Sequence, residues 1–511
     1  MPSFNLADLF EVVADAVPDR LALVADGGPA ARLTYAGLDA RANRVAHHLA
    51  AAGIGPGDHV AILARNRAEW VESMIGCYKL RAAPVNVNHR YVAGELTHLL
   101  ADSASVALIA EKDLLPGVEH DRLPALRHVL AIDGDYEDAL AAASPGRGFA
   151  PRSSDDPYLL YTGGTTGLPK GVLWRCEDIF VAAMGGGNFG GPPVADPAEL
   201  AACRDRDGLR TQVHAPLMHG GGQWITWITL TTGGTVVLWT GARFDAAAAL
   251  DLAVRERSQI LMLVGNGMAA PIADVLDAAG PGGIPGLAVF AFGSGGAPLS
   301  DAVKARLLAA VPNAYVSDNL GGSETGAMGA SEGGGRFRLG PEFAVLGPDL
   351  RPVAPGEEGV VARTGHIPSA YWNDPDKTAA TFVTGPDGRR WALQGDHARA
   401  EPDGSTTLLG RGSLVINTGG EKVFAEEVET ALRAHPGVAD AVVVGTPDER
   451  LGHRVTAVVA LQPGGPSPDA LTAHARTRLA GYKVPRAYVV VPEIRRTPVG
   501  KPDYAWARAQ T

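Results

Sequence analysis

The stretch Tyr161–Val172, YTGGTTGLPKGV, combines residue types that suit the binding of a phosphate chain. Glycine lets the backbone approach a ligand closely, threonine supplies hydroxyl groups, and lysine supplies a compact positive charge. The stretch follows the apolar run Tyr158–Leu160. Ligands of parallel α/β sheets bind at the carboxyl ends of strands. We therefore predict a phosphate-binding loop here, with a surface turn as the alternative.

This loop does not match the phosphate loop of P-loop NTPases. That motif needs glycine directly before its lysine and serine or threonine directly after it. Here Pro169 precedes Lys170 and Gly171 follows it. The sequence therefore predicts phosphate binding by a different kind of loop.

Two further glycine-rich motifs contain residues expected beside a nucleotide. In GSGGAPL, Gly293–Leu299, small residues would let a flat ring lie against the backbone, although a tight strand-to-helix turn is the alternative. In LGGSETG, Leu320–Gly326, Glu324 beside a phosphate site would be a natural Mg²⁺ ligand. A capped helix start is the alternative for that motif.

Three motifs lie nearer the C-terminus. QGDHARAEPDG, 394–404, supplies Asp396, whose carboxylate can accept both hydroxyls of a ribose, and Arg411 in LGRG can add a second contact. NTGGEKVFAEEVE covers Asn417–Glu429. RRTPVGKPDY places Lys501 between glycine and proline, which predicts a loop, where a lone lysine is usually a solvated charge.

Composition bounds the class of protein and its partners. The chain has 511 residues, 46% hydrophobic and 20% charged, which fits a globular protein of more than one domain. The formal net charge of -11 argues against nucleic acid or an anionic membrane as the main partner. Three cysteines, without a CxxC pair, are not a disulfide framework, so we expect buried or incidental thiols.

The sequence contains no recognisable targeting or spanning segment. The N-terminal stretch carries Asp8, Glu11 and Asp15 and no basic region, which argues against a signal peptide. The apolar run Ile225–Thr240 is too short to span a bilayer. We therefore expect a soluble, cytoplasmic protein without stable membrane insertion; the sequence leaves the oligomeric state open, including a homodimer.

Alternating helix and strand patterns predict an α/β fold with mainly parallel sheets. Thr34 can cap a helix whose apolar residues share one face. These apolar residues are Leu38, Val45, Ala46 and Leu49. The other predicted elements are the strands His59–Ala64, Ala83–Asn88, Thr235–Trp239, Ile260–Val264 and Leu287–Phe292, and the helix Glu69–Leu80.

The pattern changes in the last third of the chain. Short runs between turns predict a small antiparallel β subdomain at about 340–410, which would complete an N-terminal domain of residues 1–411. Residues 412–511 would form a smaller α+β domain. Its predicted elements are the helices Val423–His435 and Pro468–Leu479 and the strands Asp440–Val444 and Arg454–Leu461.

Taken together, the motifs and their order resemble the adenylate-forming superfamily of acyl-CoA synthetases, peptide-synthetase adenylation domains and luciferases. YTGGTTGLPKGV is similar to that family's phosphate loop, and AYWNDPDKT, Ala370–Thr378, is similar to another of its segments. The resemblance covers essentially the whole chain, from Leu33 to Lys501. Details such as SETG, INTGGEKV and GKPDY look most like actinobacterial long-chain or steroid side-chain acyl-CoA ligases.

The resemblance implies that ATP and a carboxylic acid form an acyl-adenylate, and that CoA, as co-substrate, then displaces AMP. Lys501 would bridge the acyl carboxylate and the α-phosphate, Ser323 would contact the α-phosphate, and Glu324 would hold Mg²⁺. The residues implied for the rest of the ATP site are Thr162, Gly163, Gly164, Thr165, Thr166 and Gly167 with Lys170 at the β/γ-phosphates, Ser294, Gly295 and Gly296 at the adenine, and Asp396 and Arg411 at the ribose.

The resemblance also implies a moving C-terminal domain. After adenylation it would rotate, Lys501 would leave, and Gly419, Gly420 and Glu421 would form a tunnel for the thiol. His219 in PLMHG would lie beside the carboxylate and the thiol path, with a packed core histidine as the alternative. Trp224 and Trp227 would line the acyl pocket or pack in the core, and we expect at least one of them to pack.

Three positions depart from the family pattern. The hinge position, usually Asp or Lys, is Leu414, which would bias the domain populations or move the pivot to Gly412. Leu320 replaces the tyrosine that usually stacks on adenine, and Pro502 follows the catalytic-type lysine.

Other classes of function compete with this interpretation. Gly265–Ala270 matches the dinucleotide-binding pattern GxGxxA, but the following segment PGLAVFAFG lacks the required carboxylate. An adenylate-binding protein without catalysis conflicts with the presence of Lys501, Glu324 and Asp396. A third alternative keeps ATP chemistry with an acceptor other than CoA, as in diazotases that use nitrite and an aryl amine.

Overall fold

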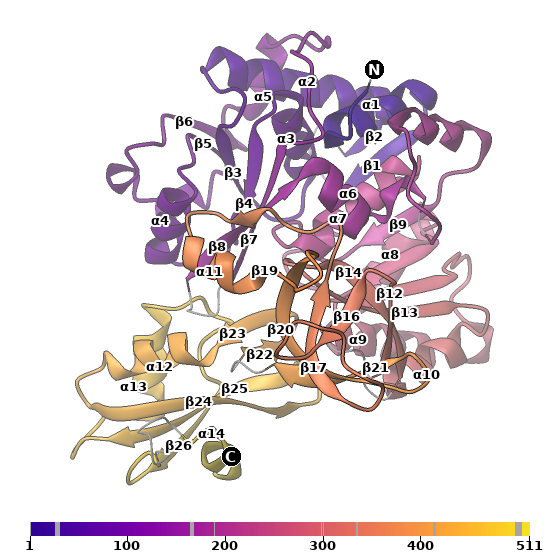
Figure 1. Ribbon diagram of the computed structural model, residues 1–511. Helices are drawn as coiled ribbons and strands as arrows, with labels where there is room; N and C mark the ends of the chain where they lie inside the picture. Colours follow the sequence, from indigo (N-terminus) through magenta and orange to yellow (C-terminus); the bar gives the residue numbers. More distant parts are fainter. Residues whose placement is uncertain are drawn as a thin grey trace.

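The computed structural model describes residues 2–25, 31–163, 168–188, 190–297, 299, 301–333, 336–411, 415–495 and 503–511. Two large sheets lie in the N-terminal part, and a smaller sheet is formed by residues beyond 415, at the bottom of Figure 1. The mixed α/β architecture with a mainly parallel core confirms the predicted fold class.

Among the described residues, the largest sheet has 14 strands, and its parallel half holds β1, β10, β9, β11, β12 and β13. From β13 onward the pairings are antiparallel. The strands are β1 (Leu21–Ala25), β2 (Arg32–Thr34), β9 (Arg210–Val213), β10 (Thr235–Leu238), β11 (Ile260–Leu263), β12 (Ala291–Gly295), β13 (Tyr315–Gly322), β14 (Gly326–Gly333), β15 (Arg336–Leu339), β16 (Phe343–Leu346), β17 (Glu358–Arg363), β19 (Phe382–Thr384), β20 (Arg390–Ala400) and β21 (Thr406–Arg411).

The second sheet carries the predicted phosphate loop at one end of its β7–β8 hairpin, and the third sheet belongs to the C-terminal part. The strands of the second sheet are β3 (His59–Leu63), β4 (Ala83–Asn86), β5 (Ala107–Glu111), β6 (His128–Ile132), β7 (Pro157–Gly163), β8 (Pro169–Arg175) and β18 (Ala370–Tyr371). Those of the third are β22 (Val415–Thr418), β23 (Glu421–Phe424), β24 (Val438–Asp448), β25 (Gly452–Leu461) and β26 (Ala487–Val491).

Helices cover the sheets (Figure 1). They are α1 (Leu6–Ala16), α2 (Tyr35–Ala51), α3 (Ala68–Lys79), α4 (Ala93–Asp102), α5 (Tyr136–Ala142), α6 (Cys176–Ala183), α7 (Gly220–Thr231), α8 (Ala246–Glu256), α9 (Gly265–Ala278), α10 (Asp301–Ala310), α11 (Pro375–Thr381), α12 (Ala425–Arg433), α13 (Pro468–Arg476) and α14 (Tyr504–Ala509). The short 3₁₀ segments are η1 (Leu115–Gly117), η2 (His120–Arg122), η3 (Gly185–Gly187), η4 (Pro197–Asp205) and η5 (Gly280–Gly282).

Helix α2 forms for the reason that its sequence predicts. The Thr34 side chain accepts a hydrogen bond from the Gly37 N–H at 3.1 Å and so caps the first turn. Leu38, Val45 and Leu49 are fully buried on one face. The three cysteines, Cys77, Cys176 and Cys203, are buried free thiols, as predicted.

Two predicted elements are wrong in position. The strand predicted at Leu287–Phe292 is β12, Ala291–Gly295, because pairing with β11 begins only at Ala291 and the Leu287 N–H closes a turn onto Ile284. The first three residues of GSGGAPL therefore belong to a strand. The helix predicted from Val423 begins at Ala425, since Val423 pairs with Ile416 in the β22–β23 hairpin.

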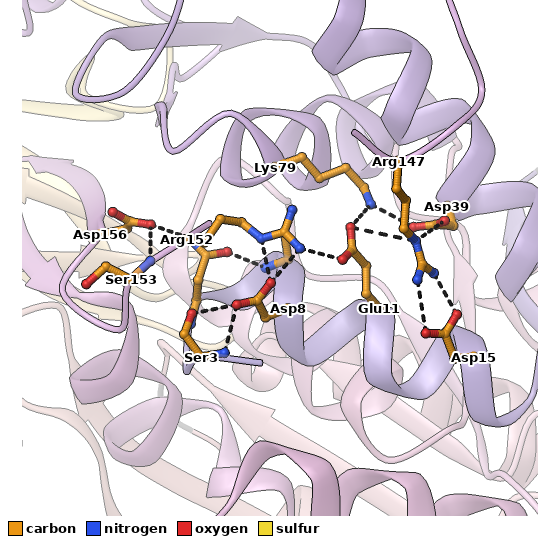
Figure 2. Close-up of polar contacts among 12 residues, drawn as sticks. Ser3, Asp8, Glu11, Asp15, Asp39, Lys79, Arg147, Arg152, Ser153 and Asp156 are labelled. Carbon is orange, nitrogen blue, oxygen red and sulfur yellow. Dashed lines mark hydrogen bonds and ion pairs between the residues drawn. The ribbon is translucent and has the colours of Figure 1, made fainter. Parts of the chain in front are cut away.

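A buried group of ion pairs joins α1, α2 and α3 to residues 147–152 (Figure 2). The Lys79 ammonium is fully buried and lies 2.7 Å from Asp39 Oδ1 and 2.5 Å from Glu11 Oε1. Arg147 also contacts Asp39, and Arg152 also contacts Glu11. A cavity of about 360 Å³ beside this group is lined by residues 8, 11 and 147–152, and none of the predicted site residues borders it.

We expect Lys79→Met to lower the apparent free energy of unfolding by about 3 kcal/mol, because removing one partner of a buried ion pair leaves uncompensated charge inside the protein. Urea unfolding followed by tryptophan fluorescence would measure the change. Arg122→Met removes an exposed pair with Glu119 and should leave the free energy of unfolding nearly unchanged. Equal changes in the free energy of unfolding for the two substitutions would show that the buried ion pairs of Lys79 do not stabilise the fold.

Candidate active site

The β7–β8 hairpin carries the two ends of the predicted phosphate loop. Thr162 pairs with Lys170 and Gly163 with Pro169, whereas Gly164–Gly167 lie outside the described residues. Asn86 in β4 fixes this hairpin, because its side-chain amide donates to the Tyr161 carbonyl at 2.8 Å and its side-chain oxygen accepts from the Tyr161 N–H at 2.8 Å. A loop between antiparallel strands differs from the strand–loop–helix arrangement of P-loop NTPases.

Lys170 forms an ion pair with Asp374. Asp374 caps α11 by accepting from the Lys377 N–H at 2.9 Å. The hydrogen bond from Lys170 lowers the pKa of Asp374, so the carboxylate is ionised at neutral pH. The AYWNDPDKT segment therefore orients Lys170, the lysine of the predicted phosphate loop, through Asp374.

Ser323 and Glu324 lie in the turn between β13 and β14. The alternative of a capped helix start is therefore wrong, because strands flank the motif on both sides. The Trp174 indole N–H donates to the Ser323 carbonyl at 3.0 Å, and the Tyr371 hydroxyl donates to Glu324 Oε1 at 2.6 Å. These two contacts come from the second sheet and attach the turn to the phosphate-loop hairpin.

Arg363, which was not predicted as a site residue, contacts the residue that follows this turn, Thr325. Its side chain is 4% exposed, and its Nη1 donates to the Thr325 carbonyl at 2.5 Å and to the Ala182 carbonyl at 3.0 Å. Burial lowers the pKa of Arg363 to about 10, which still leaves it charged at neutral pH. A fixed positive charge thus lies directly behind the Ser323–Glu324 turn.

The predicted adenine and ribose residues come from β12, β20 and β21. Ser294 is buried, and its hydroxyl accepts from the Gly265 N–H at 3.0 Å, so it fixes the start of α9. Gly296 has φ +79°, and no other atom lies within 4 Å of the place that a Cβ would take, which leaves the backbone open there. Asp396 pairs with Arg411 across β20 and β21, which places both on neighbouring strands as a shared ribose contact requires.

Two contacts relate these strands to the Glu324 turn. Thr325 hydrogen-bonds to Gln394, two residues before Asp396. Asn319, the Cα partner of Gly295, donates from its side chain to the Ser294 carbonyl at 3.1 Å. Leu320, the residue that replaces a stacking tyrosine, packs against the cluster of Met328, Val345, Val361 and Ala398.

The Gly419–Glu421 loop of the C-terminal part lies beside Val264 at the end of β11 and beside Ala297. A side chain on Gly420 would clash with Val264, so only glycine fits the close approach to the end of β11. The Glu421 carboxylate lies 2.6 Å from Arg90 Nη1 and 3.2 Å from His219 Nε2. Burial alone would raise the pKa of Glu421, but His219 and Arg90 hold it at about 2, so the carboxylate is ionised.

An apolar stripe continues from His219 along α7. His219 occupies the N-cap position, and Gly221, Trp224, Ile225 and Ile228 follow at helical spacing on the face that is not fully buried. Trp224 donates to the Tyr158 hydroxyl at 3.2 Å, which fixes its indole. Trp227 is fully buried, which confirms that one of the two tryptophans packs in the core.

Three glycines begin α7, although glycine weakens a helix. A Cβ on Gly220 would lie 2.9 Å from Leu160 and Trp224, and one on Gly222 would clash with Pro216, so both positions exclude side chains for packing reasons. Gly221 is exposed and has no atom within 4 Å of a Cβ. The packing of the protein therefore does not explain this glycine, and it leaves open space beside His219 and Trp224.

The donor set around Glu324 fits Mg²⁺. Among the residues that the structure describes, no cluster of three His, Cys, Asp or Glu side chains forms a dedicated metal cage. Mg²⁺ is usually held by one or two carboxylates together with substrate phosphates and water. One carboxylate, oriented by the Tyr371 hydroxyl beside the phosphate-loop hairpin, matches that pattern.

The structure describes residues from seven of the predicted motifs, and part of the prediction falls outside the described residues. Lys501, Pro502, Gly412 and Leu414 lie outside the described residues, as do Gly164–Gly167. Sequence reasoning missed Arg90, Asn86, Arg363 and Tyr371. The only signal for Tyr371 and Asp374 was their place in AYWNDPDKT, whereas Arg90 and Arg363 carry no local motif.

The helices formed by the described residues do not include one with the length and apolar character needed to cross a membrane.

Comparisons with known proteins agree on one family. The family model described as "AMP-binding enzyme" matches residues 10–372, and the model described as "AMP-binding enzyme C-terminal domain" matches residues 427–501. A 3-oxocholest-4-en-26-oate–CoA ligase of Rhodococcus rhodochrous is 44% identical over 539 residues, covering 100% of this chain and 96% of the relative.

A second relative and a solved structure extend this result. A medium/long-chain-fatty-acid–CoA/3-oxocholest-4-en-26-oate–CoA ligase of Mycolicibacterium smegmatis is 43% identical, covering 100% of this chain and 97% of the relative. The structure of the amide bond synthetase McbA from Marinactinospora thermotolerans is similar with a TM-score of 0.80 and 26% identity, covering 98% of this chain and 99% of that one.

Proposed function

Because the chain belongs to the AMP-binding enzyme family, we propose that it is an AMP-forming acyl-CoA ligase that activates a long apolar carboxylic acid. The observation that carries the proposal is that the β7–β8 hairpin contacts the Glu324 turn on one side and lies beside β23, whose Glu421 reaches His219, on another. ATP, the acid and CoA are the partners that it requires. ATP and CoA are cytoplasmic metabolites, which supports a cytoplasmic location.

In the first step, an acid oxygen attacks the α-phosphorus of ATP, and the bond to pyrophosphate breaks. Both reactants are anions, so the site must neutralise charge and align them. Lys170 and the phosphate loop would hold the β- and γ-phosphates, Ser323 the α-phosphate, and Asp396 with Arg411 the ribose. Lys501 would bridge the two reacting anions. Mg²⁺, held by Glu324, would neutralise phosphate charge.

In the second step, the CoA sulfur attacks the acyl carbonyl, and the bond from that carbon to the AMP oxygen breaks. We propose that residues 1–411 and 412–511 are the two domains. The Gly419–Glu421 loop of the second domain would form one wall of the thiol path. Arg90 neutralises the ionised Glu421 carboxylate, which lets Glu421 approach His219 inside the protein. His219 would face the thiol, and in its neutral form, with Nε2–H donating to Glu421, its other ring nitrogen would be left to accept the thiol proton.

The two steps need different faces of the C-terminal domain. Alternate residues of β24 point to opposite sides: Val443 packs with α12 and α13, whereas Val442 packs with Trp506 and Ala507 of α14. The body of α14 thus packs on the face of β24 opposite to α12 (Figure 1), while its first residue, Tyr504, donates to Glu429 of α12 at 3.1 Å. Delivery of Lys501 to the site therefore requires a rotation of this domain.

The α7 stripe supports a long apolar acid. From Gly221 to Ile228 the helix rises by roughly 10 Å, which spans a medium-length acyl chain or several fused rings. Trp224, Ile225 and Ile228 would bury apolar carbon of the acid, which is the main source of affinity for such a group. The steroid and fatty acids named for the two relatives have this apolar character.

We expect Gly221→Leu to raise KM for a long-chain or steroid side-chain acid by about 10-fold or more, since one misplaced methylene already costs 10-fold or more in an apolar pocket. A short acid should be affected less, and the fold should be unchanged because no protein atom meets the new Cβ. Steady-state kinetics with both acids would measure this. Equal effects on short and long acids would contradict the placement of the acyl group along α7.

An acceptor other than CoA is the second candidate for the second step. It is favoured by the structural similarity to an amide bond synthetase. In that case the adenylation residues would act as proposed, and an amine or, as in diazotases, nitrite with an aryl amine would replace the thiol.

The test is AMP release from ATP and Mg²⁺ with short, long-chain, aryl and steroid side-chain acids, each with and without CoA, and with mass spectrometry of the products. A CoA thioester of one acid class is the expected result. AMP without a thioester would indicate that another acceptor takes part in the second step. An amine, and nitrite with an aryl amine, would then be tested as that acceptor. No AMP with any acid would contradict the proposal.

A further inference from the structure

A buried lysine joins the C-terminal part of the chain to the N-terminal part, outside the proposed catalytic machinery. Lys483 lies between α13 and β26, and its side chain is 2% exposed. Its ammonium lies 2.6 Å from Glu95 Oε1 in α4 and 2.8 Å from Glu427 Oε1 in α12. One cation is therefore shared by a carboxylate from each side of the contact.

The surroundings make this contact specific. The rings of Tyr91 and Tyr482 lie 5.2 and 5.8 Å from the ammonium, at cation–π distance. The Glu95 side chain is 7% exposed, and its second oxygen accepts from the Val92 N–H at 3.1 Å, which orients the carboxylate. Buried charges must be paired, so separating Lys483 from Glu95 requires both groups to be resolvated.

The lysine contact and the Glu421 contact act on the same face of the C-terminal part. Glu427 and Lys483 lie on the side of α12, and β23 presents Glu421 to Arg90 and His219 from that side. Trp506 and Ala507 of α14 pack on the opposite face, and only Tyr504 at the start of α14 reaches Glu429 of α12. An orientation that turned the α14 face toward the site would therefore break the Glu95–Lys483 pair while leaving Lys483 its partner Glu427.

We propose that the Glu95–Lys483 ion pair is a latch that holds the C-terminal domain in the orientation where Gly419–Glu421 enter the active site. Glu95 and Lys483 are then positioning residues for thioester formation and have no part in adenylation. The inference rests on the proposed function, because it assigns the latched orientation to the second step. The pair also opposes the return to the adenylating orientation.

Two matched substitutions separate the latch from ordinary stabilisation. Glu95→Gln removes the inter-domain charge but keeps an oxygen that can cap α4, whereas Glu427→Gln removes the charge that Lys483 shares within its own domain. For each variant, the rate of thioester formation from a supplied acyl-adenylate and CoA is measured, and ATP–pyrophosphate exchange reports adenylation. Glu119→Gln, an exposed carboxylate that bonds Thr97 of α4, serves as a surface control.

We expect Glu95→Gln to slow thioester formation by about 10-fold, within the range of typical coupling between two conformations, with adenylation unchanged or faster. Lys483→Met should likewise slow thioester formation and leave adenylation unchanged or faster. Glu427→Gln and Glu119→Gln should keep the wild-type ratio of the two rates. If Glu95→Gln lowers both rates equally, or leaves both unchanged, the latch is wrong.

The outcome also separates this inference from the proposed function. A wild-type protein that forms no acyl-CoA from acyl-adenylate would contradict the proposed function itself. A wild-type protein that forms the thioester, with a Glu95→Gln variant of unchanged ratio, would contradict only the latch. Because the readout is a ratio of two rates in one folded sample, a general loss of stability does not imitate it.

Discussion

Replacing Lys501 with alanine is expected to lower acyl-adenylate formation by about 10³-fold or more, which corresponds to the loss of one strong electrostatic contact in a transition state. Lys501 would supply the positive charge between two anions that must come into contact. Thioester formation from a supplied acyl-adenylate should be largely unchanged, because we propose that this step uses the other face of the C-terminal domain. The same substitution would thus divide the reaction into its two halves.

ATP–pyrophosphate exchange and single-turnover thioester formation measure the two halves separately. Lys112→Ala is a suitable control, since Lys112 is an exposed lysine just after β5, and both rates should stay at the wild-type level. An equal loss of both half-reactions in Lys501→Ala would contradict the role given to this lysine.

The second large effect is expected for Glu324→Gln, which removes the proposed Mg²⁺ ligand. Adenylation should fall by about 10²–10³-fold, and the Mg²⁺ concentration for half-maximal rate should rise, because the neutral amide is a weaker ligand than a carboxylate. The rate of pyrophosphate exchange as a function of Mg²⁺ measures both quantities.

A matched variant tests the contact seen in the structure. Tyr371→Phe keeps the carboxylate but removes the hydroxyl that donates to Glu324 at 2.6 Å. We expect a smaller loss, about 10-fold, as found for residues that orient a metal ligand. If Glu324→Gln leaves the Mg²⁺ dependence unchanged, Glu324 does not hold the metal.

Sequence patterns predicted the elements that depend on neighbouring residues in the chain, such as a capped helix with one apolar face. They failed where a strand partner from elsewhere in the chain sets the boundary. Helix α2 could be predicted because Thr34 caps it and its apolar residues share one face. The strand β12 was misplaced because its start depends on the partner β11, and no local pattern in Leu287–Phe292 distinguishes the paired residues from the preceding turn. Val423 was misassigned for the same reason, since its hairpin partner Ile416 decides its conformation.

The candidate site shows the same division. Glycine, threonine and lysine in YTGGTTGLPKGV carry a chemical signal, so residue types alone predict a phosphate loop here, and that role stays a prediction. Arg90 and Lys483 carry no signal, because a single charged residue is normally solvated. Lys483 is buried, and both residues pair with carboxylates far away in the chain: Arg90 with Glu421, about 330 residues away, and Lys483 with Glu95, about 390 residues away. Only the three-dimensional structure reveals these contacts.

Whether the acid is activated as an acyl-adenylate before transfer can be decided by one isotope experiment. The acid is supplied with both carboxylate oxygens as oxygen-18, together with ATP, Mg²⁺ and CoA, and the products are weighed by mass spectrometry. Attack of the acid on the α-phosphorus predicts AMP that carries one heavy oxygen, together with unlabelled pyrophosphate and an acyl-CoA. Unlabelled AMP, or ADP with a labelled phosphate, would contradict the account.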